Sequence, residues 1–285
     1  MTSGVALLGT KGGPAIRQGS PMPTSSLLVL GDRQVVVDCG LGVTRGLVDQ
    51  GVALKALRRI VVTHLHSDHY LELGPLMHTA WTAGLKDPVT VWGPSGLDRY
   101  WQGFLASMAA DIALRIEDEG RPDLAGLLRI EVIDPDAVVD LDGIEMRTMR
   151  VQHPPLVDCF ALSFRGAGRH VVFSGDTAPL PALAGFASGA DLLVHEAMLE
   201  DGLRALFARI GNTDERLMTH LLQSHSPAQA VGRIAGEAGV GRLALHHLVP
   251  SDDPDFGEAD WIAAVREAWD GPLDIGRDGL WIGLE

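Results

Sequence analysis

One short segment constrains this chain more than any other part of its sequence. Residues 63–69 read Thr-His-Leu-His-Ser-Asp-His. They place four possible metal ligands within six residues, namely His64, His66, Asp68 and His69. Imidazole nitrogens and carboxylate oxygens are the ligands that zinc and similar divalent ions take. The β-branched residues at 60–62 predict a buried strand just before the segment. We therefore expect a metal site held rigidly at the end of a strand.

Three further candidate ligands also follow predicted strands. His153 stands before two prolines, and Asp176 follows an apolar segment that ends in Ser-Gly. His247 follows the apolar residues 243–245, which predict a strand, and the neighbouring His246 is the alternative ligand there. Because strand ends can meet at one edge of a sheet sandwich, these residues are expected to converge on the histidine-rich segment.

The size and organisation of the chain favour one large domain. Its 285 residues are 46% hydrophobic, which is ample for a sizeable α/β core. No linker or low-complexity tract divides the sequence, and the candidate ligands are spread along most of it. We therefore expect a single hydrolase domain over residues 1–285. The last apolar segments predict a closing hairpin over Arg277-Asp-Gly279.

Residues 97–118 carry apolar side chains at three- and four-residue spacing, which predicts an amphipathic helix. Such a helix could pack on the core, cover a site as a lid or contact a second copy of the chain. Its aromatic residues suit an apolar substrate or a subunit interface. The segment 97–128 is therefore expected to form a helical lid or dimer contact, with a homodimer as the expected assembly and core packing as the alternative.

The net charge of −14 restricts the partners that the sequence favours. An acidic chain repels phosphate backbones unless basic residues gather on one face. Arg58-Arg59 is the one adjacent pair of basic residues, and it leads into the predicted buried strand. No signal sequence and no run of 18 apolar residues is found, so a cytoplasmic protein without a membrane partner is expected; a signal peptide removed earlier is the alternative.

The histidine-rich segment resembles the His-x-His-x-Asp-His signature of the metallo-β-lactamase superfamily. Several other segments resemble, in order, the ribonuclease Z and arylsulfatase-like branch of that superfamily: 8–14, 25–29, 35–40, 173–179, 195–197, 225–226 and 243–247. The resemblance implies a four-layer αββα sandwich. It also implies two divalent metal ions, zinc first and Mn²⁺ or Fe²⁺ as alternatives. The implied ligands are His64, His66 and His153 for one ion, Asp68, His69 and His247 for the other, and Asp176 as the bridge.

The resemblance also implies catalytic roles outside the ligand set. Asp68 is expected to orient the metal-bound hydroxide that attacks the substrate. His225 is expected to protonate the leaving group, with Glu196 holding its ring. An imidazole beside a carboxylate is a sensible general acid near neutral pH.

One departure from the family pattern bears on the substrate. Ribonuclease Z proteins that process tRNA carry a long arm between the third histidine ligand and the bridging aspartate, whereas Asp176 follows His153 by only 23 positions here. With the negative charge, this predicts that tRNA is not a partner. We expect a zinc hydrolase of a small-molecule carboxylic ester or lactone, aryl sulfate or phosphodiester. A nuclease or cyclic-nucleotide phosphodiesterase is the alternative, and a non-catalytic metal-binding sensor is a more distant one.

Overall fold

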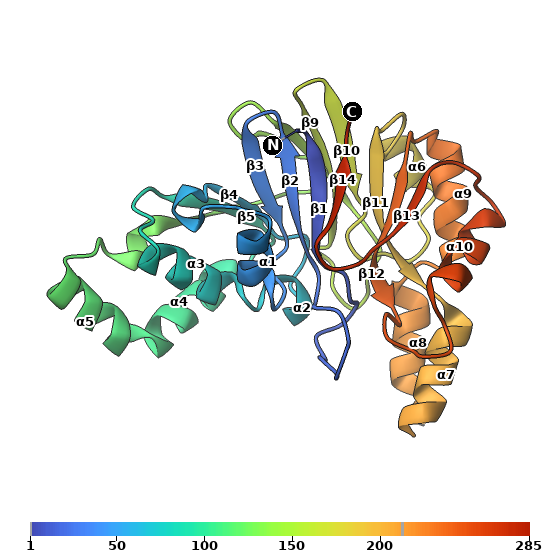
Figure 1. Cartoon of the computed structure of the whole chain (residues 1–285), viewed down its shortest axis with the longest axis horizontal. Coiled ribbons are helices and arrows are strands. Elements are labelled where there is room, and N and C mark those ends of the chain that lie inside the picture. The colour runs from blue at the N-terminus through green and yellow to red at the C-terminus, as the bar shows by residue number, and fades with distance from the viewer. Residues whose placement is uncertain (1, 212–213) are drawn as a thin grey trace.

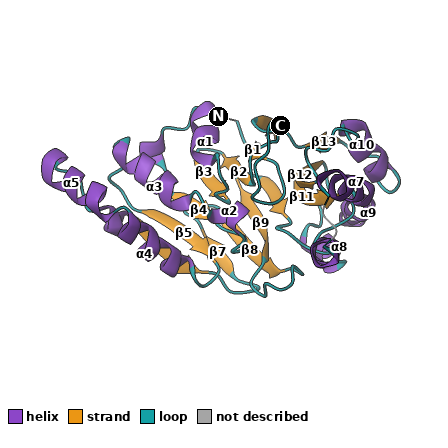
Figure 2. Cartoon of the chain, turned by 90° about the horizontal axis from the view of Figure 1, so that it is seen from below, coloured by secondary structure: helices purple, strands orange, loops and turns teal. Residues whose placement is uncertain are grey.

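The computed structural model describes residues 2–211 and 214–285, and these residues form two seven-stranded sheets with helices outside both (Figures 1 and 2). The first sheet contains, in spatial order, β14 (Leu280–Gly283), β1 (Gly4–Gly9), β2 (Ser25–Leu30), β3 (Arg33–Val37), β4 (Arg59–Val61), β5 (Val89–Gly93) and β6 (Leu128–Val132). The second contains β13 (Leu273–Ile275), β12 (Leu243–Val249), β11 (Leu192–Met198), β10 (Arg169–Phe173), β9 (Phe160–Gly166), β8 (Glu145–Arg150) and β7 (Val138–Asp140).

The helices are divided between the two halves of the chain. Those of the first half are α1 (Val43–Asp49), α2 (Ser67–Tyr70), α3 (Leu73–Thr82), α4 (Leu97–Ser107) and α5 (Ala109–Glu119), with short 3₁₀ turns at Leu54–Ala56 and Leu124–Leu127. Those of the second half are α6 (Ala182–Phe186), α7 (Glu200–Ile210), α8 (Glu215–Ser224), α9 (Ala228–Ala238) and α10 (Glu258–Arg266). The expected four-layer αββα sandwich is confirmed. No described helix is long and apolar enough to cross a membrane.

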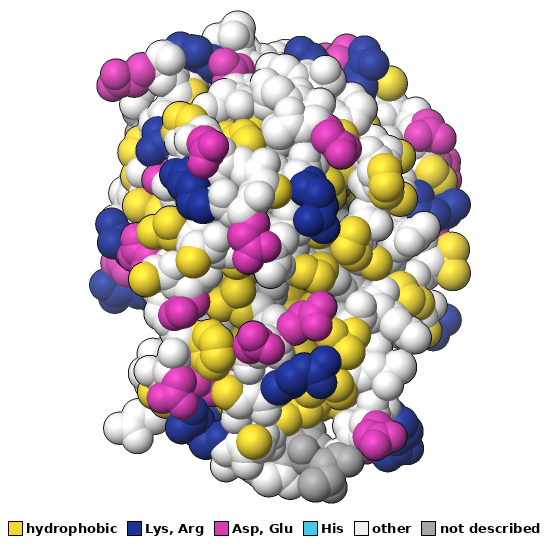
Figure 3. Space-filling model, turned by 90° about the vertical axis from the view of Figure 1, so that its right-hand side faces the viewer, with side chains coloured by type: hydrophobic (Ala, Val, Ile, Leu, Met, Phe, Trp, Pro, Cys, Tyr) yellow, Lys and Arg dark blue, Asp and Glu magenta, His cyan; other side chains and the backbone are white. Residues whose placement is uncertain are grey.

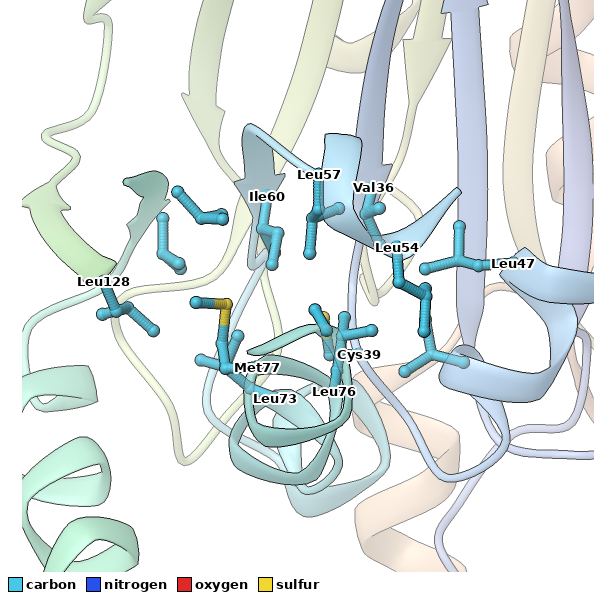
Figure 4. Close-up of a cluster of buried hydrophobic side chains, with 14 of the residues drawn as sticks. Val36, Cys39, Leu47, Leu54, Leu57, Ile60, Leu73, Leu76, Met77 and Leu128 are labelled. Carbon is cyan, nitrogen blue, oxygen red and sulfur yellow. The ribbon is translucent and has the colours of Figure 1, made fainter. Parts of the chain in front are cut away.

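Clusters of buried hydrophobic side chains hold these layers together. In β1, Ala6 and Leu8 point toward the helices, whereas Val5 and Leu7 point toward the other sheet, as strand alternation requires. Both faces are buried, so the strand sequence is continuously apolar rather than alternating. Figure 4 shows the outer cluster of the first half, where β3 and β4 meet α3 through fully buried side chains such as Ile60 and Met77. Each such side chain contributes about 1.5–3 kcal/mol.

The predicted helix over 97–118 is divided in two, because α4 ends at Ser107 and α5 begins after Met108. Both helices lie at the left of Figure 1, where α4 packs on α3. The Gly74 amide of α3 donates to the Tyr100 hydroxyl at 3.0 Å, and this hydroxyl donates to the Leu71 carbonyl just before α3 at 2.7 Å. No described residue of 97–128 lines the cavity of about 340 Å³ beside the candidate ligands. α4 packs on the core of the first half, and a lid or dimer contact over 97–128 stays a prediction.

The predicted closing hairpin is wrong. β13 pairs in parallel with β12, whereas β14 crosses to the first sheet and pairs antiparallel with β1. The turn at Arg277-Asp-Gly279 therefore carries the chain from one sheet to the other. Asp278 stabilises this crossing because its carboxylate accepts hydrogen bonds from the backbone amides of Thr10 and Met22. The crossing brings the C-terminal strand beside the loop that follows β1.

Candidate metal centre

The histidine-rich segment follows the carboxyl end of β4, which lies between β3 and β5 in the first sheet. His66 is the residue before α2, and Asp68 and His69 occupy the single turn of that helix. Asp38 fixes the turn, because its Oδ2 lies 2.8 Å from His69 Nδ1 and its Oδ1 accepts the Thr63 amide at 2.8 Å. A carboxylate on one ring nitrogen leaves the other free to bind a metal. Asp38 directly follows the apolar residues 35–37, and no local pattern predicts its contact with His69.

Three imidazole nitrogens converge in the first group of candidate ligands. His66 Nδ1 lies 3.2 Å from His64 Nε2 and 2.9 Å from His153 Nε2. The ring of His153 is fixed from behind, where its Nδ1 lies 2.8 Å from the Ser224 carbonyl. Burial is the main cause that lowers the pKa of His64. Burial also lowers the pKa of His153, to about 4. Neutral imidazoles are the form that binds metal ions, so this group fits one cation.

Two histidines and two carboxylates form the second group. His247 Nε2 lies 3.0 Å from Asp176 Oδ2 and 3.3 Å from Asp68 Oδ2, and His69 Nε2 lies 3.3 Å from Asp176 Oδ2. Burial alone would lower the pKa of His247, but Asp176 and Asp68 outweigh it and raise that pKa to about 10. The two carboxylates thus require a positive charge at this position. A divalent ion would supply it, so this group also fits a cation.

Asp176 lies between the two groups, as a bridging ligand must. Its Oδ2 is 3.7 Å from His64 Nε2 and 3.9 Å from His153 Nε2, in addition to its contacts in the second group. It follows β10 in a turn where Gly175 has a φ of 58°. A side chain at Gly175 would meet the Phe160 carbonyl at 2.5 Å, so glycine is required there. The structure thus brings all seven candidate ligands together.

A bulge in β12 decides which of the two adjacent histidines points into the site. The strand does not end at residue 245 but continues to Val249, and its pairing with β11 skips His247. His247 has a φ of 41°, and its ring points toward Asp68 and Asp176. His246 points away, with its Nε2 2.8 Å from the Gly9 carbonyl. His247 therefore occupies the position predicted for the ligand, and His246 supports the strand.

The expected general acid and its partner also lie together. His225 follows α8, and its Nδ1 is 3.3 Å from Glu196 Oε2. Glu196 Oε1 accepts the backbone amides of Thr177 and Ser226 at 3.2 and 2.8 Å, which fixes the carboxylate. The ring of His225 stacks on that of His247 with centroids 5.3 Å apart. His225 is therefore placed beside the second group, and its Nδ1 faces the carboxylate.

A cavity of about 340 Å³ opens beside these residues and was not anticipated from the sequence. One wall is apolar and comes from α7 and α8, which project together below the sandwich in Figure 1. The opposite wall is the loop that follows β1, including Lys11 and Arg17. His220, which belongs to no recognisable motif in the sequence, also lines the cavity. The amphipathic pattern of residues 202–210 could have indicated such a wall, but not which surface it faces.

The loop after β1 supports the second group of ligands directly. The Gly13 amide donates to Asp68 Oδ2 at 2.8 Å. A Cβ at Gly12 would lie 2.9 Å from His247 Cε1 and would overlap Val249. Gly12 therefore allows the loop to pack against the ring of His247.

We expect Gly12→Ala to weaken metal binding by about 10- to 100-fold, the usual cost of disturbing the support of a ligand. The added methyl group must push the ring of His247 or the loop itself. Zinc titration of the metal-free protein would measure the effect. Gly103→Ala is the matched control, because nothing lies within 4 Å of a Cβ there. Equal zinc affinity in both variants would contradict the proposed packing.

Comparison with known proteins places this geometry in a family. The family model described as Anti-Pycsar protein Apyc1 matches residues 5–233. A ribonuclease Z of Mycobacterium sp. (strain KMS) is 32% identical over 284 residues, which cover 96% of this chain and 93% of that protein. The fold is similar to that of the metallo-β-lactamase fold protein YhfI from Bacillus subtilis, with a TM-score of 0.72, 20% identity and 98% of each chain covered. Human tRNase Z, short form, gives a TM-score of 0.66, 20% identity and 99% coverage of each chain.

These relatives contradict the expectation that tRNA is not a partner. The mycobacterial relative is a ribonuclease Z and aligns over 96% of this chain in only 284 positions, which leaves no room for a long inserted arm. The short interval between His153 and Asp176 thus does not separate this chain from proteins of that name. The net charge was also a poor guide, because it sums over the whole surface and says little about one cavity.

The chain has the metallo-β-lactamase fold, and its candidate ligands could hold metal ions. The expected resemblance to the ribonuclease Z-like branch is confirmed. The chain belongs to the family of Anti-Pycsar protein Apyc1, in the ribonuclease Z-like branch of the metallo-β-lactamase superfamily.

Proposed function

We propose that this protein is a two-metal phosphodiesterase that cleaves RNA. The observation that carries the proposal is the placement of Asp176 between two groups of candidate ligands, in a chain 32% identical to a ribonuclease Z. A two-ion site suits in-line displacement at phosphorus, because it stabilises both the attacking and the leaving oxygen. The nuclease alternative thus replaces the carboxylic ester, lactone and aryl sulfate substrates that we first expected.

The proposed division of labour follows from the geometry. Two divalent ions, when bound, lower the pKa of a coordinated water and offset charge on the phosphoryl oxygens. Asp68, held by the Gly13 amide, is placed to orient that water. His225, whose Nδ1 lies 3.3 Å from Glu196 Oε2, is placed to give a proton to the leaving oxygen. General acid catalysis of this kind is worth about 100- to 10,000-fold.

The cavity favours one nucleotide at a time. Its volume of about 340 Å³ is near the lower end for small-ligand sites. The apolar wall includes Leu206, Phe207 and Leu221, which offer a surface for a base beside the candidate metal centre. On the face shown in Figure 3, acidic and basic side chains are interspersed, so the net negative charge does not form one continuous patch there. The same volume favours a cyclic nucleotide as the second candidate substrate.

We expect the metal-loaded protein to cleave precursor tRNA that carries a 3′ trailer. Product length on a denaturing gel would locate the cut bond. If the ions are required, a chelator should abolish cleavage and added zinc should restore it. The 3′,5′-cyclic nucleotides are assayed in parallel, because their hydrolysis without RNA cleavage would favour the second candidate. A protein that binds zinc but hydrolyses neither substrate would contradict the proposed function.

A further inference from the structure

Lys11 is a buried cation next to the candidate metal centre that the proposed chemistry does not yet use. Lys11 is only 3% exposed to solvent. It lines the cavity between the candidate ligands and α7. The backbone there is fixed on both sides, since the Lys11 amide donates to the Met22 carbonyl at 3.0 Å and the Gly12 amide donates to the Leu248 carbonyl at 3.1 Å. These bonds fix the backbone of the loop, whose next residues, Gly12 and Gly13, lie against His247 and Asp68.

The ammonium group of Lys11 forms no ion pair within 4 Å among residues 2–211 and 214–285, and the carboxylates of Asp68 and Asp252 act on it only from a longer distance. Its Nζ donates to the Gly12 carbonyl at 2.8 Å, which is a neutral acceptor. The nearby Arg17, in contrast, is paired with Asp252 through two hydrogen bonds of 2.7 Å. Burying a charged amine without a counter-charge is costly. A ligand with negative charge would offset that cost when it enters the cavity.

The surroundings indicate which ligand would do so. Among the described residues that line the cavity, the carboxylates are Asp68 and Asp176, both of which are candidate metal ligands. The other two lysines of the chain, Lys55 and Lys86, are exposed and lie outside this lining. Lysine binds phosphate as a compact point charge. Lys11 is thus the cation of the cavity that remains available to an anionic substrate.

We propose that Lys11 binds a phosphoryl oxygen of the substrate and so selects anionic phosphodiesters over uncharged esters. The inference rests on the proposed function for the substrate class. It assigns the selection of charge to one residue of the protein in addition to the metal ions. The affinity of the cavity for a substrate would then depend on the charge of that substrate more than on the shape of its base.

The test measures binding rather than turnover. Titration calorimetry of the metal-containing protein compares adenosine 5′-monophosphate with uncharged adenosine. We expect Lys11→Met to weaken binding of the monophosphate by about 10- to 100-fold, the range for a hydrogen bond to a charged group, and to leave adenosine unchanged. Lys11→Arg should restore part of the loss. Lys55→Met removes the same charge from the surface and should bind both probes like the wild type.

Several outcomes would overturn the inference. One is an unchanged affinity of Lys11→Met for the monophosphate at equal metal content, and another is an equal loss for adenosine, which would assign Lys11 to folding of the loop. A wild type that binds the monophosphate no better than adenosine overturns it as well. If Lys11→Met does not fold, Lys11→Gln serves as the neutral variant. Failure of RNA cleavage would refute the proposed function without changing these affinities, so the two failures are distinguishable.

Discussion

Replacing His247 by alanine should abolish hydrolysis and remove one of the two metal ions expected per chain. His247 Nε2 lies close to both Asp68 and Asp176. Its loss removes one of the imidazoles that would bind a cation together with these two carboxylates. Removing a direct ligand empties a coordination position, which exceeds the 10- to 100-fold cost typical of supporting residues. Elemental analysis of protein purified without chelator, together with phosphodiester turnover, would measure both effects.

His246→Ala is the matched control for that experiment. Its ring is equally buried but bonds to the Gly9 carbonyl, so its removal should lower the melting temperature while both ions remain. Losing one hydrogen bond of this kind costs about 0.5–1.5 kcal/mol in the free energy of unfolding. If His246→Ala loses the ion and His247→Ala keeps it, the bulge in β12 is placed one residue too far along the chain.

His225→Ala should slow hydrolysis most for phosphodiesters whose leaving group is a poor one. A ribose hydroxyl must be protonated as it departs, whereas nitrophenolate leaves without a proton. General acid catalysis is worth about 100- to 10,000-fold where it is needed. We therefore expect a loss in that range with an RNA substrate and little loss with bis(p-nitrophenyl) phosphate. Parallel kcat measurements on the two substrates give the contrast.

Two controls decide how that result is interpreted. Glu196→Gln should show the same trend with a smaller loss, because Glu196 only holds the ring of His225. Metal content must be measured for both variants, since His225 also lies close enough to Asp176 and His153 to serve as a ligand. An equal loss with both leaving groups would assign His225 to substrate positioning. A lost ion would place His225 among the ligands.

The correction about tRNA has a physical lesson. The net charge of −14 is the sum over the whole surface, and exposed charges further apart than about 8–10 Å are largely screened. What the substrate meets is the cavity, where Lys11 and the proposed ions stand beside two carboxylates. The net charge of the whole chain was therefore not a sufficient ground for excluding a substrate class.

Much of the candidate site was predictable because its chemistry is local in sequence. The segment 63–69 carries four candidate ligands on one loop and one helical turn, and Asp176 comes three residues after its strand ends. The supporting residues were harder to predict. Asp38 bonds to His69 across 31 positions, and the Gly13 amide bonds to Asp68 across 55. Nothing in the local sequence around either residue specifies its partner.

The sequence by itself determined the ligand types, their order and the strands that carry them, because β-branched runs and the residues that end them are local properties. Only the tertiary structure decided which histidine of the pair 246–247 faces the site, since one bulged residue reverses the direction of every side chain that follows. It also decided that α7 and α8, rather than α4, border the cavity. An amphipathic helix shows which of its faces is apolar, but the surface that this face meets depends on packing between residues far apart in the chain.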